Sequence, residues 1–159
     1  MKPSLYFAAP LFSQAELAFN AALATQLEAF FDVYLPQRDG GLFDTLVREG
    51  MSVGTASTLI FNRDVEAINK SDVLLLVLDG RTVDEGAAFE IGYAHAKGKV
   101  CVGLQTDPRR LLAVGNNPMI NGPLISIFGT VESLLDWASS YAPLVASGQR
   151  YTKAPGLNA

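Results

Sequence analysis

The most constraining feature of this sequence is an unbroken run of six apolar residues at positions 73–78. A strand that is apolar on both faces has to be covered on both sides, which is typical of central strands in parallel sheets. A second, largely apolar run at 99–105 follows a segment, 85–97, whose small and apolar residues favour a helix. Because buried strands that alternate with helices form doubly wound sheets, this pattern predicts an α/β fold.

The remaining segments continue this alternation. We expect further strands at 4–10, at 32–37 and within 117–129, and further helices at 13–31, 57–71 and 130–147. This order predicts a five-stranded, mostly parallel sheet flanked by helices, with ligands bound at the carboxyl ends of the strands. The expected organisation is a single domain at 1–146 and a loose C-terminal tail at 147–159, which contains polar residues, Gly and Pro.

The composition narrows the class of partner. The formal net charge is −4, with 16 acidic and 12 basic residues, which argues against a nucleic-acid partner because such proteins carry basic patches. The single cysteine, Cys101, cannot form an internal disulfide and indicates a reducing compartment. The N-terminus lacks the features of a secretory signal, and no apolar run approaches the roughly 18 residues of a membrane span. We therefore expect a cytoplasmic protein that does not enter a membrane.

The common cofactor motifs are missing from the sequence. The residues AAPLF follow the first expected strand, where a dinucleotide-binding protein would have G-x-G-x-x-G, and no P-loop motif occurs. One histidine, His95, and one cysteine do not make a zinc site. We therefore expect neither a metal nor an organic cofactor.

Acidic residues gather instead around one strand-to-helix junction, at Asp79, Asp84, Glu85 and Glu90. Asp84 and Glu85 fall at the start of the expected helix, where they could be ordinary capping residues that interact with the helix dipole. Glu90 falls inside the helix among small and apolar residues, so its charge has to be paired, used in chemistry, or turned to solvent. The residues alone leave these interpretations of Glu90 open.

Two more polar residues are candidates for the same end of the sheet. Asp64, on the expected helix before the central strand, is either a site carboxylate or a surface residue paired with Arg63 or Lys70. Tyr6, on the first strand, is either a ligand of a carboxylate or a core aromatic residue. Carboxylates at the mouth of an apolar pocket suit cleavage at an anomeric carbon. One of them can attack or stabilise the oxocarbenium-like centre while another group protonates the leaving group.

The sequence resembles the nucleoside 2-deoxyribosyltransferases in three stretches: LYFAAPLFSQAE, NRDVEAINKSDVLLLVLDG and VDEGAAFEIGYAHAKGK. The resemblance spans residues 4–128 and implies a flavodoxin-like α/β fold. It also implies a ping-pong exchange of purine or pyrimidine bases on 2-deoxyribose through a covalent deoxyribosyl-enzyme. The implied partners are 2-deoxyribonucleosides, free nucleobases and further copies of the chain, in a dimer or hexamer with a shared active site.

The resemblance also implies roles for single residues near the acidic cluster. Glu90 matches the family's nucleophile, and Tyr6 matches the tyrosine that holds this nucleophile in place. Asp84 matches a ligand of the sugar hydroxyl, and Asp64 matches a candidate proton donor to the departing base.

Residues outside the acidic cluster are implied as well. Asn121 resembles an asparagine that a neighbouring subunit contributes to the sugar pocket, and Gln37 and Asp39 fall in the loop that contacts the base. Three apolar residues after or within the first expected strand could stack on the base and keep the site dry: Phe7, Leu11 and Phe12.

Two alternative functions remain open. A 2-deoxynucleoside 5-monophosphate N-glycosidase of the same superfamily would share the glutamate and the fold, but it would hydrolyse its substrate and bind a phosphate. The segment AAPLFSQ after the first expected strand has no Arg or Gly for a phosphate, which favours an unphosphorylated nucleoside. The second alternative is a non-catalytic nucleoside-binding module, which is disfavoured because Glu90 and Asp84 are both present.

Overall fold

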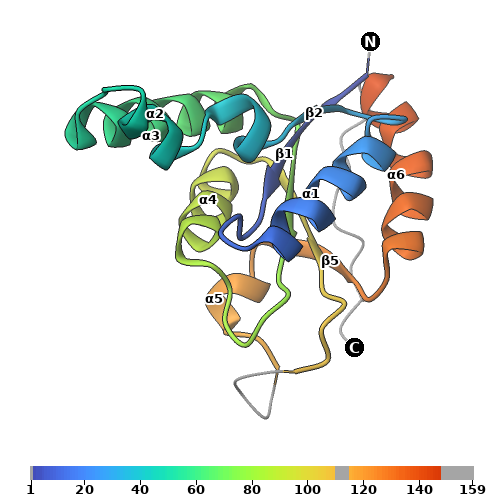
Figure 1. The fold of residues 1–159 in the computed structure, drawn as a ribbon. Coiled ribbons are helices and arrows are strands. Elements are labelled where there is room, and N and C mark those ends of the chain that lie inside the picture. The colour runs from blue at the N-terminus through green and yellow to red at the C-terminus, as the bar shows by residue number, and fades with distance from the viewer. Residues whose placement is uncertain (1, 110–114, 148–159) are drawn as a thin grey trace.

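The computed structural model describes residues 2–109 and 115–147 (Figure 1). Five strands form one sheet in the order β2-β1-β3-β4-β5, and every neighbouring pair is parallel. This is the flavodoxin-like strand order, which confirms the predicted α/β fold. The sheet is fully parallel, where the sequence predicted a mostly parallel one. The predicted tail lies, apart from residue 147, outside the described residues.

The elements follow the predicted order along the chain. The strands are β1 (Ser4–Ala8), β2 (Asp32–Tyr34), β3 (Val73–Val77), β4 (Val100–Leu104) and β5 (Leu124–Phe128). The α-helices are α1 (Gln14–Leu27), α2 (Phe43–Arg48), α3 (Val53–Lys70), α4 (Glu85–Ala96), α5 (Pro118–Asn121) and α6 (Val131–Ala146). A π-helical turn, η1 (Pro36–Gly40), follows β2. The sequence did not predict η1, α2 or α5.

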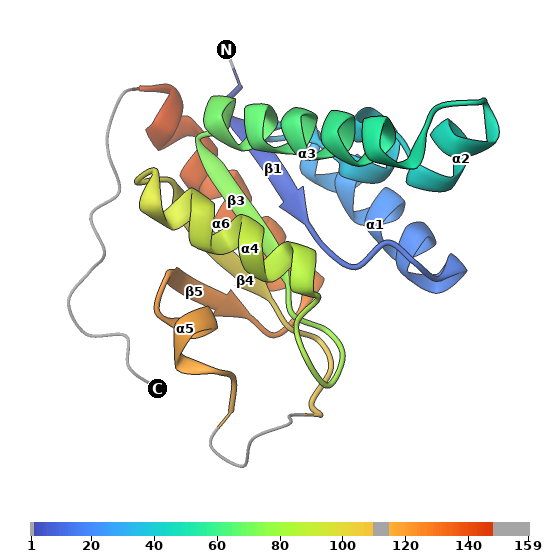
Figure 2. The same ribbon diagram turned by 90° about the vertical axis from the view of Figure 1, so that its left-hand side faces the viewer.

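Helices cover both faces of the sheet (Figure 2). One face packs against α1 and α6 and contains a large apolar cluster with Leu5, Phe7, Leu27 and Leu134. The other face packs against α3, α4 and α5 and contains a smaller buried cluster that includes Tyr6. Because side chains alternate along a strand, β1 sends Phe7 to the first face and Tyr6 to the second. The expectation that Phe7 stacks on the base is therefore wrong, because Phe7 is fully buried in the first cluster.

The helix starts are fixed by local side-chain caps. Ser13 caps α1 and forms a capping box with Glu16. Thr130 caps α6 by accepting a hydrogen bond from the backbone N–H of Ser133. Asp84 caps α4 in the same way by accepting from the backbone N–H of Ala87. The last cap fixes the direction in which α4 leaves the end of β3.

Helix α2 and the adjoining end of α3 extend beyond the sheet (Figure 1). No residue of α2 is buried within the chain, whereas α3 buries Ile68 at its sheet end. No helix in the described part of the chain has the length and apolar character needed to cross a membrane.

Candidate active site

A cavity of about 390 Å³ opens next to the carboxyl end of β1, between α3 and α4. This is the position where doubly wound sheets bind ligands. The lining is mostly apolar, and its polar side chains are Ser57, Asp64, Asp84 and Glu90. On α3 the lining residues Phe61, Asp64, Val65 and Ile68 follow helical spacing, so one face of this helix forms a wall.

Glu90 faces this cavity and is held by Tyr6. The Tyr6 hydroxyl donates a hydrogen bond of 2.6 Å to Oε1 of Glu90 across the gap between β1 and α4. Tyr6 has no exposed surface, so its ring is fixed by packing and its hydroxyl has a defined position. Among the described residues, the other carboxylate oxygen of Glu90, Oε2, accepts no hydrogen bond.

The environment of Glu90 shifts its protonation. Burial raises the pKa of Glu90 from its ordinary value of 4.5 to about 7, and the charges of Asp64 and Asp84 add to this effect. The hydrogen bond from Tyr6 acts in the opposite direction, because it stabilises the carboxylate. A glutamate with a pKa near neutrality is typical of a site that uses its carboxyl group in chemistry.

Asp64 is held by a second tyrosine that the sequence did not single out. The Tyr34 hydroxyl donates to Oδ1 of Asp64 over 3.1 Å. Burial raises the pKa of Asp64, and this effect is opposed by the hydrogen bond from Tyr34 and by the charge of Arg63. Asp64 therefore takes up a proton more readily than an ordinary aspartate, which suits a group that donates a proton to a substrate.

Asp84 caps a helix and also lines the cavity. Its Oδ2 accepts a hydrogen bond of 3.0 Å from the backbone N–H of Ala87, which caps α4. The same side chain lines the cavity beside Glu90. The cap fixes the carboxylate at the cavity wall.

Three other sequence-predicted residues lie away from this cavity. Gln37 accepts a hydrogen bond from Asn20 and donates one of 2.9 Å to the backbone of Leu17, so it is turned toward α1. Asp39 accepts 2.8 Å from the backbone of Leu35 and therefore stabilises its own turn. Asn121 is exposed on α5. None of the three lines the cavity within one chain.

Comparison with protein families identifies the family of this chain. A family model described as nucleoside 2-deoxyribosyltransferase matches residues 5–136. The chain belongs to this family. The matched range includes the three cavity carboxylates, Asp64, Asp84 and Glu90, and the buried Tyr6 that donates to Glu90.

Solved structures support the assignment of the fold. A conserved protein from Enterococcus faecalis V583 is 32% identical, with a TM-score of 0.75, and the alignment covers 89% of this chain and 99% of that chain. A 2-deoxyribosyltransferase from Bacillus psychrosaccharolyticus is 20% identical, with a TM-score of 0.71, and the coverage is 94% and 99%. A CMP N-glycosidase from Clostridium botulinum is 21% identical, with a TM-score of 0.54, and the coverage is 87% and 98%. A search of curated proteins found no match.

Aromatic side chains form the rim of the cavity in this member of the nucleoside 2-deoxyribosyltransferase family. Phe12, which the sequence predicted, lines the cavity and is 78% exposed. Phe43, Phe61 and Phe89 also line it and are exposed, and the rings of Phe61 and Phe89 are 6.0 Å apart. Large apolar rings that stay exposed at a cavity mouth are available to stack on a planar ligand.

Sequence reasoning missed Phe43, Phe61 and Phe89. For Phe61 a signal existed, because this residue precedes Asp64 by three positions on the same helix and therefore shares its face. Phe43 and Phe89 carry no comparable signal.

Other titratable residues lie outside the cavity lining. Cys101 is buried in β4, and burial raises the pKa of its thiol to about 12, so it behaves as a packed apolar side chain. His95 is exposed in the last turn of α4. Within residues 2–109 and 115–147, no group of three His, Cys, Asp or Glu side chains is placed to hold a metal ion.

Proposed function

We propose that this protein is a nucleoside 2-deoxyribosyltransferase that exchanges the purine or pyrimidine base of 2-deoxyribonucleosides through a covalent deoxyribosyl–Glu90 intermediate. The observation that carries this proposal is the 2.6 Å hydrogen bond from Tyr6 to a glutamate that faces a cavity shared with Asp64 and Asp84. Three carboxylates around one cavity suit a transition state with positive charge on the sugar.

In the first half-reaction, Glu90 acts as the nucleophile. Its free oxygen attacks the anomeric carbon while the bond from that carbon to the base breaks, and the bonding electrons leave with the base. Asp64, in its protonated form, supplies the proton that the departing ring nitrogen needs. Tyr6 keeps the Glu90 carboxylate in the attacking orientation, and Asp84 binds a sugar hydroxyl.

In the second half-reaction, a new base replaces the first. Its ring nitrogen attacks the anomeric carbon, the ester bond to Glu90 breaks, and Asp64 takes up the proton of the incoming base. Transfer in place of hydrolysis requires that water is kept away from the ester. Phe12 and the other rim phenylalanines supply apolar surface that excludes water from the ester. A base that stacks on these rings closes the cavity.

The complete site, in this proposal, needs a second copy of the chain. Asn121 is exposed outside its own cavity, so it is available to the sugar pocket of a neighbouring subunit. The unburied helix α2 offers a surface for such an assembly, a homo-oligomer of two or six copies. Gln37 and Asp39 contact the base only if η1 rearranges when a ligand binds. We place the protein in the cytoplasm, where free nucleosides and bases meet.

The competing function is hydrolysis of a 2-deoxynucleoside monophosphate. The similarity in fold to a CMP N-glycosidase is compatible with this function. The cavity argues for an unphosphorylated substrate. In the described part of the chain, no Lys or Arg lines the cavity, whereas three carboxylates do. A phosphate there would meet like charges without a compensating cation.

One experiment separates these functions. The protein is incubated with deoxyinosine and adenine and, separately, with a 2-deoxynucleoside 5-monophosphate, and the products are followed by chromatography. Deoxyadenosine as the main product supports transfer. Free 2-deoxyribose or its 5-phosphate identifies a hydrolase, and unchanged mixtures with binding detected by calorimetry identify a binding module. Incubation with deoxyinosine alone, followed by mass spectrometry of the denatured protein, detects a deoxyribosyl adduct that should be missing in Glu90→Gln.

A further inference from the structure

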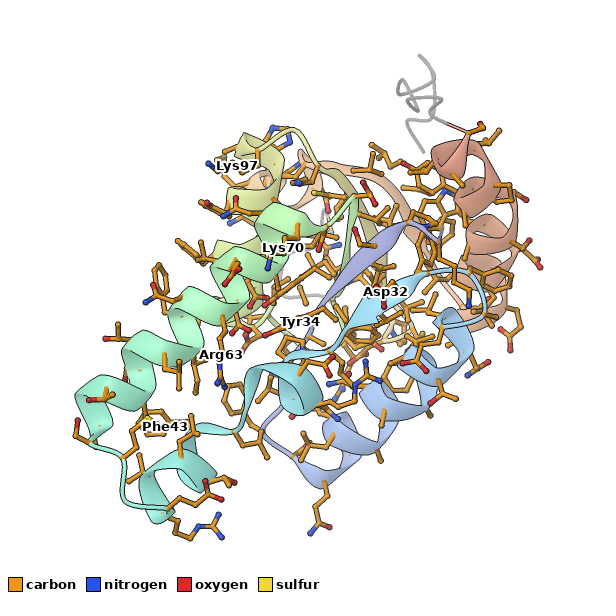
Figure 3. All side chains as sticks on the ribbon, turned by 90° about the horizontal axis from the view of Figure 1, so that it is seen from above. Asp32, Tyr34, Phe43, Arg63, Lys70 and Lys97 are labelled. Carbon is orange, nitrogen blue, oxygen red and sulfur yellow. The ribbon has the colours of Figure 1, made fainter. Side chains whose placement is uncertain are left out.

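The site contains two tyrosine–carboxylate pairs built in the same way. Tyr6 donates to Glu90 over 2.6 Å, and Tyr34 donates to Asp64 over 3.1 Å. The two tyrosines face each other across the β1–β2 ladder, and their rings are stacked with centroids 5.5 Å apart and an interplanar angle of 15°. Figure 3 shows Tyr34 between β2 and α3, the helix that carries Asp64. The family resemblance gave a role to Tyr6 and none to Tyr34.

Tyr34 does not touch the ligand space. Asp64 lines the cavity, but Tyr34 lines a separate, shallower depression together with Asp39, Ala67 and Lys70. Any effect of Tyr34 on a ligand in the cavity is therefore transmitted through its neighbours, by its hydroxyl through Asp64 and by its ring through Tyr6. Among the described residues, Tyr34 is also the only hydrogen-bond donor to the Asp64 carboxyl group.

We propose that Tyr34 is a positioning residue for protonation of the leaving base: its hydroxyl occupies one oxygen of Asp64, so that the other oxygen carries the proton and meets the base. This inference rests on the proposed function. A carboxylic acid has one oxygen that accepts and one that donates. Because the Tyr34 hydroxyl donates to Oδ1, the acid proton resides on Oδ2. When the bond to the base breaks, this proton moves from Oδ2 to the ring nitrogen, and Asp64 becomes a carboxylate that Tyr34 still stabilises.

The backbone around Gly40 keeps this pair in place. A side-chain carbon at Gly40 would lie 3.0 Å from Oδ1 of Asp64 and 3.1 Å from the Tyr34 hydroxyl oxygen, so only glycine fits without a shift. Arg63 donates a hydrogen bond of 3.1 Å to the carbonyl of Gly40 and thereby holds the turn against α3. Three elements therefore fix the hydrogen bond between Tyr34 and Asp64: β2, α3 and the last residue of η1. Such support is expected if the reaction depends on the geometry of this hydrogen bond.

The test compares two nucleosides that donate the deoxyribosyl group and differ in whether the leaving base has to be protonated. The base of deoxyinosine has to be protonated to leave, whereas the base of 7-methyldeoxyguanosine already carries a positive charge. Tyr34→Phe keeps the ring and removes the hydroxyl. We expect it to lower kcat/KM for deoxyinosine by roughly 10- to 100-fold, a part of what general acid catalysis contributes. With 7-methyldeoxyguanosine the same variant should stay within about twofold of the unaltered protein.

Matched variants make the test selective. Tyr6→Phe removes the partner of the nucleophile, so it should slow both donors. Tyr34→Phe combined with Asp64→Asn should be no slower on deoxyinosine than Asp64→Asn alone, because both changes act on one proton transfer. Gly40→Ala disturbs the Tyr34–Asp64 pair from the backbone side and should show the same selectivity as Tyr34→Phe. It tests the inference even if Tyr34→Phe does not fold.

The possible failures are distinguishable. An unaltered protein that is inert toward both donors overturns the proposed function and this inference with it. An active protein in which Tyr34→Phe and Gly40→Ala slow both donors equally, or neither, overturns only the role of Tyr34.

Discussion

The two faces of the sheet differ in what they bury. The face under α1 and α6 is a closed apolar core, in which Leu5, Phe7 and Leu27 are almost inaccessible. The face under α3 and α4 buries Tyr6 next to a glutamate and leaves a cavity. Residues of one strand, β1, serve both faces. We infer that the α1–α6 face contributes to stability alone, while the α3–α4 face combines apolar packing with charged groups beside a cavity.

The buried charged groups lower the stability of the folded chain, and substitutions on the two faces can measure this effect. Glu90 is partly buried and has a raised pKa, so its ionised form is less favourable in the folded chain than in the unfolded chain. The apolar core on the opposite face offsets such costs, because each buried Leu or Phe contributes roughly 1.5–3 kcal/mol. Substitutions on the two faces should therefore separate activity from stability.

The largest expected effect is the loss of exchange in Glu90→Ala. Removal of the nucleophile should lower the rate of base exchange by at least about 10³-fold, equal to about 4 kcal/mol in the barrier. The rate is measured by chromatography with deoxyinosine and adenine, and circular dichroism checks that the fold is kept. Glu85→Ala, an exposed neighbour on the same helix, is the control. Near-normal exchange by Glu90→Ala would show that the cavity glutamate is not the nucleophile.

The next effect belongs to the other face. Leu27→Ala should lower the free energy of unfolding by about 2–5 kcal/mol, because Leu27 is fully buried between α1 and the sheet. Below the melting temperature, exchange per folded molecule should be unchanged. Urea denaturation measures the stability, and Gln26→Ala, an exposed neighbour, serves as control. A selective loss of activity without loss of stability would contradict the division between the two faces.

A third prediction concerns stability at the site itself. Since the folded-state pKa of Glu90 lies near 7 and its ordinary value is 4.5, the folded chain binds an extra proton between these values and loses stability as pH rises through them. Glu90→Gln should therefore become more stable than the unaltered protein above pH 7, by roughly 3 kcal/mol, and this difference should shrink as the pH falls from 7 to 4.5 and be absent below that. Denaturation series at several pH values measure this. Glu66→Gln, an exposed carboxyl paired with Lys70, should show no such gain.

The smallest effect is a shift in the pH dependence of the rate. If Glu90 has to be ionised, kcat/KM falls below neutral pH, to about one tenth of its plateau one pH unit below the pKa. Tyr6→Phe should move this acid limb to higher pH, because the hydrogen bond from Tyr6 lowers the pKa of Glu90. A pH–rate profile of both proteins measures the shift. If the acid limb of Tyr6→Phe coincides with that of the unaltered protein, the limb reports the ionisation of a group other than Glu90.

The sequence predicted the parts of the molecule that local patterns determine. The apolar run 73–78 and the alternating helical and strand segments around it predicted the parallel sheet. The acidic residues near apolar segments predicted that Asp64, Asp84 and Glu90 belong to the site. The helices α2 and α5 were missed because they are too short to show a helical period. The wrong placement of Phe7 was avoidable, since the alternation of strand side chains separates it from Tyr6.

Other parts of the site depend on contacts between distant segments. Tyr34 reaches Asp64, thirty positions further along the chain, and only the pairing of β1 with β2 brings it beside Tyr6. The hydrogen bonds that turn Gln37 toward α1 join segments that no local pattern relates. Such contacts follow from the assembled fold.

The pairing of Tyr6 with Tyr34 has a consequence for molecules that misfold. In a strand ladder, a slip of one residue moves every side chain of the slipped strand to the opposite face. A molecule with β2 displaced in this way could keep its secondary structure, yet Tyr34 would point toward α1 and Asp64 would lose its partner. The specific activity toward a neutral nucleoside would then measure the fraction of molecules in which β2 pairs in the native register. Preparations with identical circular dichroism could differ in this fraction.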